Sequence, residues 1–368
     1  MDVQTKLELI RRGTSEILTE EDLLLKLKSK DRLKHYIGFE ISGFVHLGTG
    51  FMTGFKIADF QKAGVDCSIY EATWHAWINN KFGGDLEKIR AACEYFTQAM
   101  KVSVDVCGGD SSKVKFIKGD ELYHNNDEYW KKVLDVSRNL TLARDLRAIT
   151  ITGRMHTEHT TAAQLIYPPM QVADIFIMDI DLAHAGVDQR KAHVIAREVA
   201  KSVGEEKPIA VHHPLLMGLQ KPDFEPSMLS KKEIALLVSK VKMSKSVEGS
   251  AIFIHDSEEE IKNKMNNAYC IAKNTDYNPV LNWIRNLVFR DEKSSFEIIR
   301  PSKFGGNISY ENYANLEEDF AQGKIHPLDL KNSMAEWLIR FLEPVRKEFS
   351  KEKNKKLIEM ISSFKKQN

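Results

Sequence analysis

The segment HYIGFEISGFVHLG, residues 35–48, contains the pattern that decides the fold. Its first half, His35–Ile41, is a short apolar run typical of a buried strand. We expect a turn at Ser42 and Gly43, followed by a helix that begins at His46-Leu47-Gly48. A strand, a glycine-bearing turn and a helix leave backbone N–H groups free at the helix N-terminus, and such groups can bind phosphate.

Further short apolar runs follow, separated by segments with helical periodicity. The strand candidates are Val65–Tyr70, Val114–Ile117 and Ile209–His212, and two helical segments between them are Asp85–Met100 and Asp127–Ala148. Strands that alternate with helices predict a parallel sheet covered by helices on both faces. Ligands of such sheets bind at the carboxyl ends of the strands, where loops carry the chemistry.

The pattern changes after residue 256. Ser257-x-x-Glu260 has the spacing of a capping box at a helix start, and the chain has a largely helical pattern from there to its end. We therefore expect an α/β fold. A Rossmann-like parallel-sheet domain should cover residues 1–256 and hold the chemistry, and an α-helical domain should cover residues 257–368.

The composition narrows the class of protein. The 368 residues include 53 Lys+Arg and 52 Asp+Glu, so any basic surface for nucleic acid must be local. The four cysteines (Cys67, Cys93, Cys107 and Cys270) have no C-x-x-C spacing and no paired histidine spacing, which argues against a zinc site or a disulfide framework and for a reducing compartment. We expect no protein-bound metal. No apolar run approaches the roughly 18 residues of a membrane span, and Met1–Gly13 is too charged for a signal peptide. We expect a cytoplasmic protein without membrane contact.

A second motif stands almost two hundred residues after the first, at Lys242-Met243-Ser244-Lys245-Ser246. Two lysines on a loop can reach a triphosphate and neutralise charge on a departing pyrophosphate. His46 would add a hydrogen-bond donor for phosphate oxygens, and Gly48 would let a nucleotide lie against the backbone. Each motif alone also fits an ordinary turn or a solvated loop.

The two motifs in this order resemble the two signature sequences of class I aminoacyl-tRNA synthetases. Four further stretches are similar to the tyrosine-specific members of archaeal and eukaryotic type: YIGFE at 36–40, YPPMQVAD at 167–174, DQRK at 188–191 and HPLDLKN at 326–332. The resemblance covers essentially the whole chain. It has two departures: Thr49 stands where the family often has a second histidine, and Thr73 stands where it often has a carboxylate.

The resemblance implies that the chain activates tyrosine with ATP and transfers it to the 3′ end of tRNA(Tyr), as a homodimer. Mg²⁺ would accompany the nucleotide. The catalytic residues implied are His46, Lys242 and Lys245. The ATP site would comprise Gly38, His46, Gly48, Lys242 and Lys245. Tyr36 and Asp174 would bind the phenol oxygen, and Tyr167, Gln171 and Gln189 the α-ammonium. Phe304, His326 and Asp329 would contact the first anticodon base.

The residues of the stretch YPPMQVAD, 167–174, fit a tyrosine pocket physically. Pro168 and Pro169 suit the first turn of a helix, where a missing N–H costs nothing. In that helix Gln171 and Asp174 share one face with Tyr167. A buried glutamine and aspartate need hydrogen-bond partners, and a bound amino acid would supply them.

Alternatives stay open for several of these residues and for the function. Asp174 could pair with a lysine or arginine, Phe304 could anchor a loop, and Asp329 could cap a helix. His75 could pack in the core or line the pocket. The rival functions are a tryptophanyl-tRNA synthetase, a nucleotidyltransferase with a similar turn, and a synthetase-like RNA-binding protein without catalysis. Thr49 leaves the third alternative open, because it replaces a histidine of the family's first motif.

Overall fold

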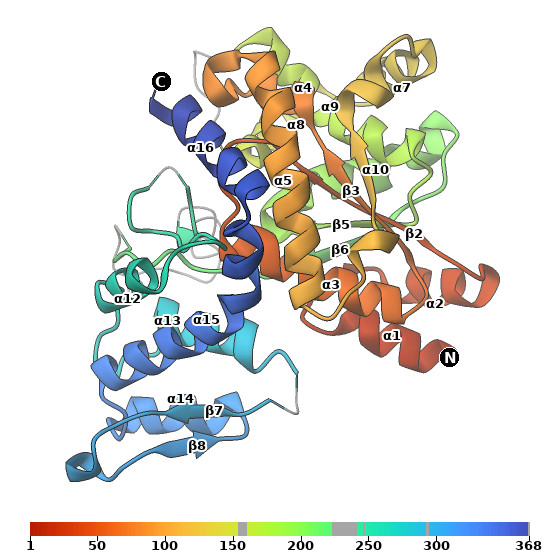
Figure 1. Ribbon diagram of the computed structural model, residues 1–368. Helices are drawn as coiled ribbons and strands as arrows, with labels where there is room; N and C mark the ends of the chain where they lie inside the picture. Colours follow the sequence, from red (N-terminus) through yellow and green to blue (C-terminus); the bar gives the residue numbers. More distant parts are fainter. Residues whose placement is uncertain (154–159, 223–240, 246, 292–293, 367–368) are drawn as a thin grey trace. The chain divides into compact units, whose positions relative to one another are not determined.

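The computed structural model describes residues 1–153, 160–222, 241–245, 247–291 and 294–366 (Figure 1). Contacts group the chain into two compact units. The first unit comprises residues 1–43, 55–214 and 356–368, and the second comprises residues 44–54 and 215–355. Residues 215–256 thus group with the helical segments that follow them. The predicted domain boundary at residue 256 stays a prediction.

The first unit is built on a six-stranded sheet with the order β1-β6-β5-β2-β3-β4. Its strands are β1 (Glu16–Leu18), β2 (Lys34–Phe39), β3 (Asp66–Glu71), β4 (Lys115–Lys118), β5 (Leu182–Gly186) and β6 (Ile209–His213). Neighbouring strands are parallel except β1, which runs antiparallel to β6 at the sheet edge. The predicted parallel sheet is confirmed, with β1 and β5 added to the four expected strands.

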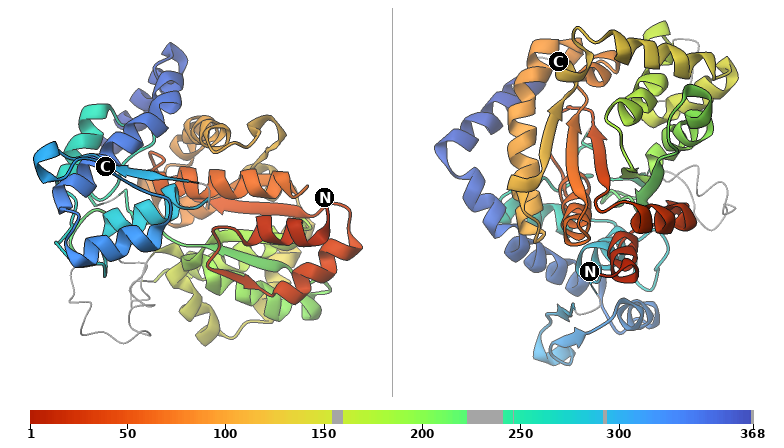
Figure 2. Two further views of the ribbon diagram at one scale, coloured as in Figure 1. Left: turned by 90° about the horizontal axis from the view of Figure 1, so that it is seen from below. Right: turned by 90° about the vertical axis from the view of Figure 1, so that its right-hand side faces the viewer.

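Helices cover both faces of this sheet (Figure 2). They are α1 (Val3–Arg11), α2 (Glu20–Ser29), α4 (Thr73–Ile78), α5 (Leu86–Val106), α6 (Gly119–Tyr123), α7 (Asp127–Arg138), α8 (Leu142–Ala148), α9 (Ala162–Ile177) and α10 (Arg190–Val199). Helix α5 lies on one side of the strands, and α9 and α10 lie on the other (Figures 1 and 2). Tyr36, Met170 and Ile195 belong to one buried apolar cluster, so β2, α9 and α10 share a core.

Helix α9 begins earlier than the sequence predicts. A capping box of Thr161 and Gln164 starts it at Ala162, and the Thr161 N–H donates to Gln164 Oε1 at 2.9 Å. Pro168 and Pro169 therefore lie inside the helix and do not open it, so this expectation was wrong. The capping box supplies a stronger start signal than the prolines, which remove backbone donors in the second turn.

The second unit is mostly helical. It contains α12 (Glu258–Asn266), α13 (Pro279–Trp283), α14 (Tyr313–Gln322) and α15 (Pro327–Phe349), with a small antiparallel pair of β7 (Phe296–Ile298) and β8 (Ile308–Tyr310). Helix α3 (Leu47–Lys62) gives its first turns, up to Gly54, to this unit, and α16 (Glu352–Lys366) begins in it. The predicted helix start at Ser257 is confirmed, because Ser257 and Glu260 form the capping box of α12.

Candidate active site

Asp174 is the centre of a buried polar cluster in the first unit. It projects from α9 with 1% of its surface exposed. Its Oδ1 accepts hydrogen bonds from the hydroxyls of Tyr129, at 2.9 Å, and Tyr70, at 3.2 Å. Its Oδ2 lies 3.7 Å from Nε2 of His75. Among the described residues, the recorded partners of Asp174 are thus tyrosines and a histidine. The alternative of a lysine or arginine partner finds no support in them.

The electrostatics of this cluster follow from its burial. Burial raises the pKa of the Asp174 carboxyl well above its usual value, and the hydrogen bonds from Tyr129 and Tyr70 oppose this. Burial, and next the charge of Asp174, raise the pKa of the Tyr36 phenol, while a hydrogen bond from Gln171 acts the other way. The structure therefore brings Tyr36, Gln171 and Asp174 together, in an environment suited to a phenolic hydroxyl.

Gly38 separates two of the phenol rings. A Cβ built at Gly38 would lie 3.3 Å from a ring carbon of Tyr36 and 3.3 Å from one of Tyr70. These distances are tighter than ordinary van der Waals contacts, so a side chain here would press on both rings. The sequence assigned Gly38 to the nucleotide. The structure indicates a second reason for a glycine here: the absence of a side chain leaves space for the rings of Tyr36 and Tyr70.

Polar groups of Gln171, Gln189 and Tyr167 form a second part of the cluster. Gln171 Nε2 donates to Gln189 Oε1 at 3.3 Å, and Gln189 Nε2 donates to the Ile151 carbonyl at 2.9 Å. The Oε1 of Gln171 is buried and has no hydrogen-bond partner among the described residues. A buried acceptor of this kind needs a donor. An ammonium group would supply one.

Glu40 is a member of this part that the sequence reasoning did not assign. Its carboxylate accepts from the hydroxyl of Tyr167 at 2.7 Å and from the amide of Asn79 at 2.8 and 3.0 Å, and Lys81 Nζ lies 3.1 Å away. Glu40 directly follows β2, at its carboxyl end, where parallel sheets bind ligands. That position was the signal that could have identified it.

His75 is packed in the interior, next to residues of the predicted tyrosine site. It is 1% exposed, its Nδ1 lies 3.0 Å from the hydroxyl of Tyr123, and its ring meets that of Tyr167 edge-on at 4.5 Å. Burial lowers its pKa to about 3, so it is neutral at pH 7. Its buried Nε2 has no hydrogen-bond partner among the described residues and faces Asp174.

His46 lies at the start of α3, in the second unit. The N–H of Thr49 donates to His46 Nδ1 at 3.2 Å, in the manner of a helix cap. Because Nδ1 accepts, the proton of the neutral ring belongs on Nε2, which lies 3.3 Å from the Thr49 hydroxyl. Burial lowers the pKa of His46 to about 3, and the charges of Lys245 and Lys242 act in the same direction. His46 is therefore a neutral N–H donor, oriented by Thr49.

Gly48 gives the ring of His46 its space. A Cβ at Gly48 would lie 3.2 Å from both Cε1 and Nδ1 of His46, closer than a relaxed contact. The glycine in the first motif thus serves the histidine two residues before it. Its predicted contact with a nucleotide stays a prediction.

The lysine motif lies in the same unit as His46. Lys242 is paired with Met217 in an antiparallel bridge, and Met243, 3% exposed, anchors the loop. The charges of the two lysines lower the pKa of His46, so Lys242 and Lys245 lie within electrostatic reach of His46. Ser246 of the motif lies outside the described residues.

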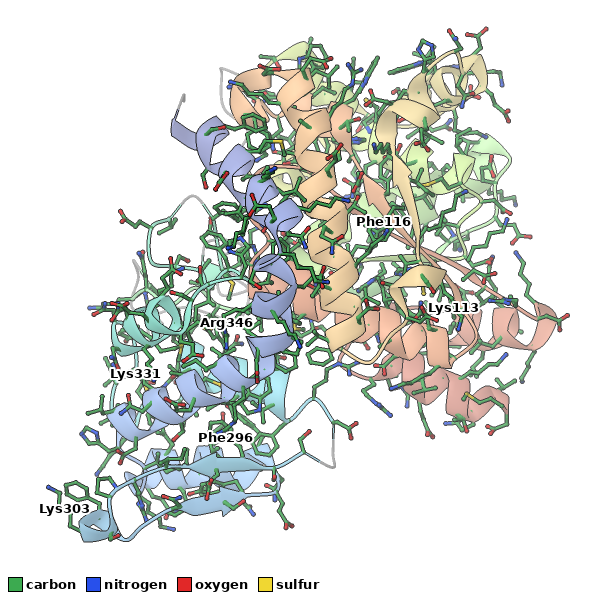
Figure 3. All side chains as sticks on the ribbon, in the orientation of Figure 1. Lys113, Phe116, Phe296, Lys303, Lys331 and Arg346 are labelled. Atoms are coloured by element: carbon green, nitrogen blue, oxygen red, sulfur yellow. The ribbon has the colours of Figure 1, made fainter. Side chains whose placement is uncertain are left out.

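The predicted anticodon residues are partly accessible. Phe304 ends a 3₁₀ turn between β7 and β8 (Ser302–Phe304); it is 59% exposed, and Lys303 Nζ lies 5.0 Å from its ring centroid. Figure 3 places Lys303 at the tip of this hairpin. This exposure argues against a loop anchor.

His326 is exposed and caps α15, because its Nδ1 accepts from the Leu328 N–H at 3.2 Å. Asp329 is half-buried in the first turn of α15. The alternative role considered for Asp329 was to cap this helix, and His326 caps it instead.

Comparison with known proteins agrees with this arrangement. The sequence model of the family described as tRNA synthetases class I (W and Y) matches residues 28–343. A tyrosine–tRNA ligase of Thermococcus kodakarensis is 53% identical over 362 residues, covering 95% of this chain and 96% of the relative. One from Pyrococcus abyssi is 50% identical, with 99% of each chain covered.

Solved structures give the same result. A tyrosyl-tRNA synthetase of Pyrococcus horikoshii, complexed with L-tyrosine, aligns with a TM-score of 0.94 at 49% identity, covering 99% of this chain and 100% of that chain. A tryptophanyl-tRNA synthetase of Plasmodium falciparum, at 17% identity and a TM-score of 0.65, shares the fold alone.

The chain belongs to the class I tRNA synthetases of the tryptophan and tyrosine family. Within that family its relatives place it among the tyrosine–tRNA ligases of archaeal type. This membership sets aside the nucleotidyltransferase reading of the first motif.

Proposed function

We propose that this chain is a tyrosine–tRNA ligase: it activates tyrosine with ATP and transfers the tyrosyl group to the 3′ end of tRNA(Tyr). The observation that carries the proposal is the buried carboxylate of Asp174, which is surrounded by phenol groups. The family membership and the names of the relatives support it.

The phenol of the substrate is read by Asp174 and Tyr36. Tyr129 and Tyr70 already donate to Oδ1 of Asp174, so Oδ2 is the oxygen that accepts the substrate's hydroxyl. Phenylalanine has no hydroxyl and would leave this buried oxygen without a donor, which a hydrogen-bonding site penalises strongly. Tryptophan offers no hydroxyl either. This chemistry favours tyrosine over both rivals.

The α-ammonium of the substrate binds at the other part of the cluster. Gln171 Oε1 is the acceptor left without a partner, and Gln189 holds the amide of Gln171 in place. Tyr167, oriented by Glu40, lies beside them. An ammonium among these oxygens makes charge-assisted hydrogen bonds, which are stronger than neutral ones.

Activation joins the tyrosine carboxylate to the α-phosphorus of ATP and breaks the bond to the β,γ-pyrophosphate. His46 donates its Nε2–H to phosphate oxygens, and the ammonium groups of Lys242 and Lys245 stabilise the charge that develops on the departing pyrophosphate. By resemblance to the family, Gly38 and Gly48 are further ATP-binding residues. Mg²⁺ would enter with ATP and would neutralise part of the charge of its phosphates. No covalent enzyme intermediate is involved.

Transfer uses the terminal ribose hydroxyl of tRNA(Tyr), which attacks the carbonyl carbon of tyrosyl-adenylate and releases AMP. Phe304, His326 and Asp329 read the first anticodon base, with the exposed ring of Phe304 as a stacking surface. The protein acts in the cytoplasm as a homodimer. Within the described residues, the helices are too short or too polar to cross a membrane.

The test is the exchange of labelled pyrophosphate into ATP, measured with each amino acid in turn. Tyrosine should support exchange, while tryptophan and phenylalanine should not at the same concentration. Exchange with tryptophan instead would indicate a tryptophanyl-tRNA synthetase. No exchange with any amino acid, from folded protein, would favour the non-catalytic alternative.

A further inference from the structure

The lysine motif rests on a short antiparallel ladder in the second unit. The N–H of Gly218 donates to the Val241 carbonyl at 2.7 Å, and the N–H of Met243 donates to the Leu216 carbonyl at 2.7 Å. Between these bonds Met217 stands opposite Lys242. In such a ladder the residue between two bonded positions turns its own N–H and C=O outward. The peptide groups of Met217 therefore point away from the lysine motif.

Helix α13 binds both of these outward groups. Asn282 Oδ1 accepts from the Met217 N–H at 3.0 Å, and the indole Nε1–H of Trp283 donates to the Met217 carbonyl at 2.8 Å. Trp283 is completely buried, whereas Asn282 is half-buried. The two residues end α13, where the chain continues into a π-helical turn, Ile284–Val288. Such turns occur frequently at functional sites.

Ser250 also contacts the ladder and the lysine motif. A Cβ at Gly218 would collide with Ser250 Oγ, so a side chain at this position would force the Ser250 hydroxyl to move. The same Ser250 hydroxyl accepts from the Ser244 N–H at 3.4 Å. The ladder thus has support from Ser250 on one side and from Asn282 and Trp283 on the other.

We propose that Asn282 and Trp283 are positioning residues for ATP activation: by holding both peptide groups of Met217, they fix where Lys242 and Lys245 stand. This rests on the phosphate role proposed for the two lysines. It also means that a helix from the predicted RNA-binding part of the chain supports the phosphate loop. Catalysis by charge stabilisation depends on preorganised groups, so a small displacement of the lysines slows the reaction more than it weakens substrate binding.

The experiment compares Asn282→Leu, which removes the acceptor at similar volume, with Asn282→Asp, which keeps an acceptor for the Met217 N–H. The control is Asn278→Ala. Asn278 also bonds backbone N–H groups at α13, those of Val280 and Leu281, whereas the side-chain hydrogen bond to Met217 N–H comes from Asn282. Tyrosine-dependent pyrophosphate exchange gives kcat and the KM values for ATP and tyrosine, and thermal unfolding gives the folded fraction.

At equal folded fraction, Asn282→Leu should lower kcat for exchange about tenfold, as expected for one lost hydrogen bond felt in the transition state. The KM for tyrosine should change less than about twofold, since none of the residues assigned to the amino acid takes part in this bond. Asn282→Asp should restore most of kcat, and Asn278→Ala should lower only the melting temperature. An unchanged kcat in Asn282→Leu, or an equal loss in Asn278→Ala, would overturn the positioning role. Wild-type protein without tyrosine-dependent exchange would instead refute the proposed function.

Discussion

Replacing Asp174 with alanine removes the acceptor that we assign to the substrate's phenol. Asp174 is 1% exposed, so its hydrogen bond to the phenol is shielded from water and is charge-assisted. Losing one such bond costs about 1.5–3 kcal/mol, which corresponds to roughly ten- to a hundredfold in kcat/KM for tyrosine. Phenylalanine should lose little or gain, because the alanine variant has no buried carboxylate for its bare ring to leave unsatisfied.

The assay is pyrophosphate exchange with tyrosine and with phenylalanine, at equal folded fraction for each variant. Asp174→Asn is the matched control, because it keeps the volume and an oxygen for Tyr129 and Tyr70 but removes the charge. Its loss should fall between wild type and alanine, since neutral hydrogen bonds are weaker than charged ones. The ratio of kcat/KM for tyrosine over phenylalanine should shrink in both variants. An unchanged ratio in Asp174→Ala would refute the phenol-reading role.

The remaining predictions concern the phosphate groups and the buried histidines. Lys245→Ala should lower kcat for exchange with little change in tyrosine affinity, because its charge acts when pyrophosphate leaves; lost tyrosine binding at full kcat would contradict this. Gly48→Ala should displace the ring of His46 and slow exchange about tenfold or more, whereas wild-type kcat would show that the ring has room. Burial lowers the pKa of His35 to about 3 and of His213 to about 4, so the unfolded state binds more protons below its own pKa of about 6.5. The stability that the neutral buried histidines contribute is complete above about pH 6.5 and is lost as the pH falls toward their folded pKa values. Denaturation in urea should therefore show a lower free energy of unfolding at about pH 6 than at about pH 7.5. An equal free energy of unfolding at both pH values would contradict this prediction.

The fold was largely predictable because its signals are local. Apolar runs and helical periodicity identified β2, β3, β4 and β6, and the capping residues identified α12. Strand β5 was missed because its sequence LAHAG contains small residues and a histidine in place of β-branched ones. The three-residue β1 is too short to show a period.

The site was predictable where the sequence motifs place residues on one element. Tyr167, Gln171 and Asp174 follow from the spacing on α9. Their partners come from other helices and strands through tertiary packing, and no spacing in the sequence reveals that Tyr129 and Tyr70 bond the same carboxylate oxygen.

Thr49 illustrates the same limit in the other motif. As a departure from the family pattern, it appeared to remove a phosphate-binding side chain. In the structure the backbone N–H at position 49, which a histidine there would also supply, donates to Nδ1 of His46, and the threonine hydroxyl lies 3.3 Å from Nε2. The departure at Thr49 therefore keeps the backbone contact that orients the ring of His46.

Charging of tRNA(Tyr) with labelled tyrosine is the most direct test of the central claim. With ATP, Mg²⁺ and tRNA(Tyr), wild-type protein should form acid-precipitable tyrosyl-tRNA, and tryptophan or phenylalanine at equal concentration should give none above background. Charging with tryptophan in preference to tyrosine, or no charging by folded protein with any of the three, would contradict the account.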